Sequence, residues 1–79
     1  MINVLFFGPV AERVGVSRVE VDFVPGMCVA DVRAQLELCY PEAFALVSLV
    51  AVDGEHVRAP AARLADRCEL VFMSKFSGG

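Results

Sequence analysis

The sequence has few of the residues from which catalytic and metal sites are usually built. It contains three cysteines, a single histidine (His56) and a single lysine (Lys75). The cysteines, Cys28, Cys39 and Cys68, are odd in number and lack the Cys-x-x-Cys or Cys/His spacing that holds zinc. We therefore expect free, buried thiols in a reducing compartment, packed as small hydrophobic side chains, and no metal site.

Long hydrophobic runs and a basic excess are also missing. Apolar residues make up 57% of the chain, but they come in short runs, none near the roughly 20 residues that span a bilayer. Residues 1–8 lack the basic region and long apolar segment of a secretory signal. We therefore expect a soluble, cytoplasmic protein without a membrane partner. The net charge of −3 also argues against a nucleic-acid partner.

The apolar residues that are present predict strands. Residues 2–7 form an apolar run closed by Gly8-Pro9, residues 17–23 alternate polar with apolar, and residues 69–73 form a second apolar run. Asp53-Gly54 is the type of two-residue turn that joins a hairpin, here between residues 49–52 and 55–57. Both faces of the first and last runs are apolar, which is typical of strands at the centre of a sheet.

Helical spacing appears between these strands. The segment from Pro9 to Gly15 predicts a short helix of about two turns. Apolar residues recur at three and four positions between residues 28 and 40, which predicts the main helix, and Pro41 ends it. Residues 42–47 allow a further turn of helix. Residues 59–67 form a connection in which Leu64 is the expected core anchor.

This order of elements predicts an α+β fold: a ubiquitin-like β-grasp roll. We expect a mixed sheet of four to five strands, with the first and last strands as parallel neighbours, one main helix and short helical turns. The expected organisation is a single domain over residues 1–73 and an extended C-terminal tail over residues 74–79.

The tail finishes on Gly78-Gly79. Neither residue has a Cβ, so this backbone fits a slot too narrow for side chains and offers the Gly79 carboxylate as a chemical group. Two terminal glycines alone also fit a frayed end, as in many domains.

Three stretches together resemble the small subunit of molybdopterin synthase, within the wider family of ubiquitin-like sulfur carriers. Residues 4–15 resemble its Leu-Phe-Phe strand and short helix with a closing glycine. Residues 51–57 resemble its Val-Asp-Gly hairpin, and residues 69–79 resemble its last strand and Gly-Gly tail. The resemblance spans nearly the whole chain, and the order and spacing of the motifs are more specific than any one of them.

The resemblance implies a chemistry for the terminus. An E1-like adenylyltransferase would use ATP to adenylate Gly79, and a sulfur donor such as a cysteine desulfurase would convert it into a thiocarboxylate. The tail would then deliver sulfur to the pterin precursor inside the large subunit of molybdopterin synthase, in a heterotetramer. The chain itself would bind no cofactor and supply no catalytic acid or base.

The resemblance also assigns roles to other residues. Gly79 is the reacting residue, and the partner enzymes would recognise the tail through four residues before it: Gly78, Ser77, Phe76 and Lys75. Phe7 and Met73 match positions of the apolar patch that contacts the large subunit, and Val57 is a looser candidate. Each of these three residues fits the core equally well, while Asp53-Gly54 and His56 are expected to be a turn and a surface residue.

The tail departs from the family pattern, which leaves the pathway open. Family members typically carry Pro-Pro-Val where Ser74-Lys75-Phe76 stands here, an arginine where Ala11 stands, and Gly-Asp where Arg67-Cys68 stands. A carrier for thiazole, cysteine or tRNA thiolation therefore stays an alternative. So do a non-catalytic β-grasp interaction module and a protein-conjugating modifier.

Overall fold

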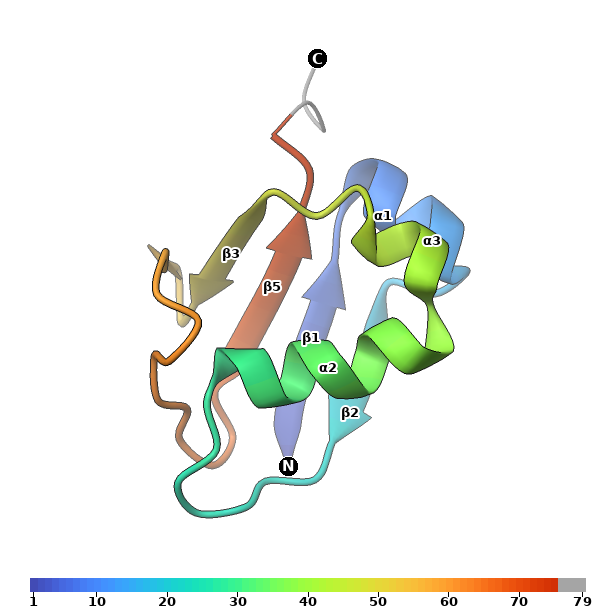
Figure 1. The fold of residues 1–79 in the computed structure, drawn as a ribbon. Helices are drawn as coiled ribbons and strands as arrows, with labels where there is room; N and C mark the ends of the chain where they lie inside the picture. Colours follow the sequence, from blue (N-terminus) through green and yellow to red (C-terminus); the bar gives the residue numbers. More distant parts are fainter. Residues whose placement is uncertain (76–79) are drawn as a thin grey trace.

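The computed structural model of the chain describes residues 1–75, and Figure 1 shows a single sheet crossed by one long helix. The strands are β1 (Ile2–Phe6), β2 (Arg18–Val21), β3 (Leu49–Val52), β4 (Glu55–His56) and β5 (Glu69–Met73). The helices are α1 (Gly8–Val14), α2 (Val29–Cys39) and α3 (Pro41–Phe44). The α+β roll predicted from the sequence is therefore confirmed, with five strands, one main helix and two short ones.

The first and last strands lie side by side at the centre of the sheet. The strand order is β2-β1-β5-β3-β4, and β1 runs parallel to β5 with Phe6 opposite Phe72. The antiparallel strands β2 and β3 flank this pair, and β4 continues the sheet beyond β3 as a hairpin. This arrangement brings the first and last strands together and confirms the predicted central parallel pair.

The core lies on the face of the sheet that α2 crosses. Alternate strand residues point to this face, and they are fully buried where β1 and β5 meet, as at Phe6 and Phe72. Phe44 of α3 completes an aromatic cluster, with its ring centroid 4.9 Å from that of Phe72 and 6.2 Å from that of Phe6. Leu64, the expected anchor of the long connection, is also buried in this core.

Local backbone requirements explain where the elements begin and end. Gly15 ends α1 with φ of 94°, a left-handed conformation that favours glycine. Asp53 and Gly54 both have positive φ, 49° and 87°, as the two-residue turn between β3 and β4 requires. At the start of α2, the Asp31 carboxylate accepts a 2.9 Å hydrogen bond from the Cys28 backbone N–H, which stabilises the first turn of the helix.

Two sequence-based expectations need correction. Strand β2 ends at Val21, so Phe23 packs on the core from the following loop and not from the strand. The three thiols are free, but only Cys68 is buried, and Cys39 is exposed. The physical reason lies at the end of α2, where the Tyr40 side chain packs against the core in place of Cys39.

Within residues 1–75, no helix is both long enough and apolar enough to cross a membrane.

Candidate functional site

The chain leaves the sheet at the end of β5, beyond the tip of the central parallel pair (Figure 1). Lys75, the first predicted tail-recognition residue, is exposed, while Ser74 before it is only 9% exposed. The other predicted tail residues, Phe76, Ser77, Gly78 and Gly79, lie outside the described residues. The structure thus defines where the tail begins.

The main chain at this exit is held by one residue of the loop between α3 and β3. The Ser48 backbone N–H donates a 3.0 Å hydrogen bond to the Met73 carbonyl oxygen. The Ser48 hydroxyl oxygen accepts a 2.8 Å hydrogen bond from the Lys75 backbone N–H. This role was not predictable from the sequence, because Ser48 is a lone polar residue among apolar ones and meets β5 only in the folded chain.

Phe7 and Met73 lie together on the open face of the sheet, opposite α2. Phe6 and Phe72 are paired and point into the core. The next residue along each chain therefore projects from the other face, and Phe7 keeps the extended conformation needed for this, with φ of −127° and ψ of 154°. Phe7 is 49% exposed and Met73 is half-buried. The sequence allowed each residue to lie either in an interface or in the core. Phe7 lies at the surface, and Met73 lies at the edge of that surface.

Apolar side chains from three neighbouring strands share this open face. The register places Leu49 of β3 opposite Met73, and Val71 of β5 opposite Leu5 of β1. We call the following group the open-face patch: Leu5, Phe7, Leu49, Val71 and Met73. The patch borders the exit of the tail, because Met73 is the last residue of β5. At the β2 side it meets a polar rim, where the Arg18 guanidinium donates a 2.9 Å hydrogen bond to the Asn3 side-chain oxygen.

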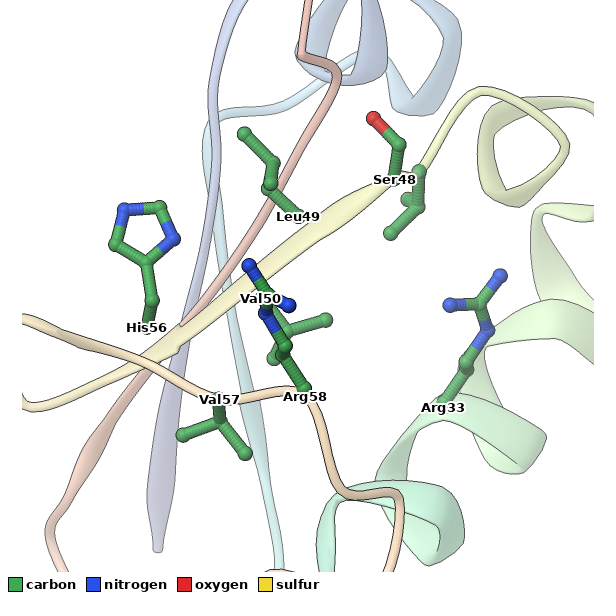
Figure 2. A pocket seen from close by; sticks show the side chains of 8 residues that line it. Arg33, Ser48, Leu49, Val50, His56, Val57 and Arg58 are labelled. Carbon is green, nitrogen blue, oxygen red and sulfur yellow. The ribbon is translucent and has the colours of Figure 1, made fainter.

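Val57, the third predicted interface residue, lies on the opposite face of the sheet from Phe7 and Met73. Its backbone N–H donates a 2.8 Å hydrogen bond to the carbonyl oxygen of Val50, a residue that faces α2. Both valines line a groove between α2 and the β3–β4 hairpin, and Figure 2 shows them close to Arg58, with Arg33 projecting from α2. The structure therefore brings two of the three predicted interface residues together and separates the third.

The polar groups around this groove are largely committed to the fold. The Arg33 guanidinium donates to the Glu37 carboxylate at 2.6 Å and to the Phe44 carbonyl oxygen at 3.3 Å. It also lies 5.7 Å from the centroid of the Phe44 ring, so Arg33 ties α2 to α3. His56 of β4, which Figure 2 also shows, is exposed, as expected for a surface residue.

Two carboxylates have altered proton affinity, and both serve the fold. The hydrogen bond from the Cys28 backbone N–H holds the pKa of Asp31 below its usual value. A hydrogen bond from the N-terminal ammonium group, at 2.7 Å, lowers the pKa of Asp66. The ammonium group lies at the end of β1 opposite the tail exit (Figure 1). Among residues 1–75, no three His, Cys, Asp or Glu side chains gather as a metal ion would require.

Comparison with solved structures gives similar chains along almost the full length. SAMP1 from Haloferax volcanii superposes with a TM-score of 0.82 at 25% identity, covering 99% of this chain and 98% of that one. A Pyrococcus furiosus protein described as a molybdopterin converting factor, subunit 1, superposes with a TM-score of 0.80 at 18% identity, covering 92% and 94%. These chains share the β-grasp fold, in agreement with the fold predicted above.

A search of curated proteins found no match. The sequence profile of the ThiS family, in contrast, matches residues 4–79, which include all of the sheet except the first two residues of β1, and the Gly-Gly tail. The chain therefore belongs to the ThiS family, and its fold is that of sulfur carriers and ubiquitin-like modifiers.

Proposed function

We propose that this protein is the small subunit of a molybdopterin synthase and carries sulfur on Gly79 in molybdenum cofactor biosynthesis. The observation that carries the proposal is the family match, which runs through the tail to Gly79. The fold likeness to a protein described as molybdopterin converting factor subunit 1 supports this pathway. The exit of the tail beside the open-face patch, with its exposed Phe7, supports a role in which the chain is bound by other proteins.

The proposed chemistry begins with activation of a poor electrophile. The Gly79 carboxylate attacks the α-phosphate of ATP on an E1-like adenylyltransferase, and pyrophosphate leaves. The terminal sulfur of a persulfide, supplied by a donor such as a cysteine desulfurase, then attacks the acyl-adenylate carbon and displaces AMP. A thiol cleaves the resulting S–S bond, forms a disulfide and leaves a thiocarboxylate on Gly79. The thiocarboxylate is the sulfur donor for the pterin precursor.

The protein acts in this scheme by positioning and not by acid–base catalysis. ATP belongs to the adenylating partner, so the chain needs no bound cofactor. Gly78 supplies a backbone slim enough for a narrow active-site channel, and Phe76 and Lys75, with Ser77, are the residues that the partners recognise.

The open-face patch is the proposed docking surface for the large subunit. It combines an exposed aromatic residue, Phe7, with the half-buried Met73 and Leu49. Aromatic residues and methionine are enriched in the buried centres of protein interfaces. Because the patch borders the tail exit, the same partner would bind the patch and receive the tail. Val57, on the other face, would lie outside this contact. It would contact a different partner or only line the groove beside α2.

A second candidate function is conjugation to other proteins. It is favoured by the similarity to SAMP1, which is also described as small archaeal modifier protein 1 and is 25% identical over 99% of this chain. In this alternative, the Gly79 acyl-adenylate is attacked by a lysine amine of a target protein. A carrier role in thiazole, cysteine or tRNA thiolation uses the same first steps and differs in the acceptor.

Reconstitution of the whole reaction tests the proposal. The full chain is incubated with its adenylyltransferase, ATP and a sulfur donor, then with the large subunit and the pterin precursor, and the dithiolene product is measured. We expect one sulfur to leave the chain for each transfer. A matched control adds one residue after Gly79, which removes the reacting carboxylate and should abolish transfer. Sulfur transfer to a thiazole synthase, or Gly79 found in isopeptide bonds, would select an alternative instead.

A further inference from the structure

The two hydrogen bonds of Ser48 lie on either side of Ser74, at the point where the chain leaves the sheet. Ser48 donates from its backbone N–H to Met73 O at 3.0 Å and accepts at its hydroxyl oxygen from Lys75 N–H at 2.8 Å. Both distances are those of well-formed hydrogen bonds. One residue therefore fixes the main chain immediately before and immediately after Ser74, which is almost fully buried.

The reason for this arrangement is that the ladder between β3 and β5 ends at this point. Strand β3 begins at Leu49, which pairs with Met73, so β3 offers no regular ladder partner to the main chain beyond β5. A backbone N–H that loses its ladder partner needs another acceptor. The Ser48 hydroxyl supplies that acceptor to Lys75, and in Figure 2 it points toward the upper end of the β5 ribbon.

Ser48 itself stands on a well-supported loop. The backbone N–H groups of Leu46 and Val47 donate to carbonyl oxygens of α3, at 3.0 Å and 3.3 Å. The Arg33 guanidinium binds the Phe44 carbonyl oxygen at the end of the same helix. The loop that carries the Ser48 hydroxyl is thus anchored to α3 and, through Arg33, to α2.

We propose that Ser48 is a positioning residue that sets the direction in which the tail leaves β5. This inference rests on the proposed function, in which the tail must deliver the Gly79 carboxylate to a partner's active site. Four residues follow Lys75, and they span at most about 14 Å when extended. A small change in the direction of the main chain at Lys75 would therefore produce a larger displacement of the Gly79 carboxylate. A misplacement of about 1 Å at a reacting group costs up to roughly a hundredfold in rate.

The test compares Ser48→Ala with Ser48→Thr, which keeps the hydroxyl, and with Ser17→Ala, a matched control at an exposed serine far along the chain. The first readout is amide hydrogen exchange of Lys75 in the full chain. Loss of one hydrogen bond should accelerate it roughly three- to tenfold in Ser48→Ala, while Ser48→Thr and Ser17→Ala should match the wild type.

The second readout is kcat/KM of the adenylyltransferase with each variant as its protein substrate. We expect a loss of at least about tenfold for Ser48→Ala, recovery in Ser48→Thr, and melting temperatures within a few degrees of the wild type in all variants. Unchanged Lys75 exchange in Ser48→Ala, or faster exchange with unchanged kcat/KM, would overturn the proposal. If the wild type itself is no substrate, the proposed function fails, and Lys75 exchange alone then decides whether Ser48 holds the tail.

Discussion

Phe7 illustrates how a single residue acquires a surface role from its place in the sheet. Its neighbour Phe6 is fully buried, but one step along an extended chain reverses the direction of the side chain. Among residues 1–75, Phe7 is the only aromatic residue that is exposed. An exposed aromatic beside the tail exit contributes little to the core and has much to contribute to an interface.

Replacing Phe7 with serine should therefore weaken partner binding without unfolding the protein. We expect the free energy of unfolding to change by no more than about 0.5 kcal/mol, while the Kd for the large subunit rises at least about tenfold. Isothermal titration calorimetry measures the affinity. Leu38→Ser is the control, because Leu38 is 87% exposed on α2, across the sheet from the patch. Equal affinities of Phe7→Ser and the wild type would exclude the patch as the docking surface.

Asp31 should make the stability of the fold depend on pH. Its pKa is lowered in the folded state, first by the hydrogen bond from the Cys28 N–H. The folded state therefore favours the carboxylate, and this stabilisation is present above the ordinary pKa of 3.8 and is lost as the pH falls through the folded-state value. Asp31→Ala should lower the melting temperature at pH 7 and lose most of this effect in strong acid. A deficit of equal size at both pH values would contradict this role.

At the scale of the element, β5 divides two tasks between its two faces. Phe72 points into the core and is fully buried, whereas Met73 points to the open face and is half-buried. The strand also carries the tail, and the Met73 carbonyl oxygen accepts the hydrogen bond that the Ser48 backbone N–H donates. Substitutions at these two neighbouring positions should therefore have different effects: one mainly on stability and the other mainly on partner binding.

We expect Phe72→Ala to destabilise the protein by about 3–5 kcal/mol, since it leaves a cavity against two other phenylalanine rings. Met73→Ala should cost clearly less, because its side chain is already partly in water, but should weaken binding of the large subunit. Urea unfolding gives the stability, and Phe72→Leu provides a folded comparison if Phe72→Ala unfolds completely. The reverse order of the two stabilities would show that the faces of β5 are wrongly assigned.

For the whole molecule, the sequence was enough to predict the architecture. The apolar runs of β1 and β5, the Asp53-Gly54 turn and the spacing of Val29, Val32 and Leu36 in α2 each correspond to a feature of the structure. Such local patterns are informative because strand and helix periodicities decide which face is buried.

The arrangement of the candidate site was less predictable. Phe7, Met73 and Val57 are all apolar residues at the ends of predicted strands, so the sequence does not separate them. Only the sheet register shows that Val57 lies on the face of the sheet opposite Phe7 and Met73. The role of Ser48 depends on a contact between residues 27 positions apart. The exposure of Cys39 follows from the packing of Tyr40. Each of these facts comes from tertiary packing and not from a local pattern.

The intact mass of the full chain after incubation with its adenylyltransferase, ATP and a sulfur donor tests the central claim most directly. We predict a gain equal to the replacement of one oxygen atom by sulfur, located in the peptide that ends at Gly79, and no gain without ATP. An unchanged mass, with an adenylyltransferase shown to be active on another carrier, would contradict the claim that this protein carries sulfur on Gly79.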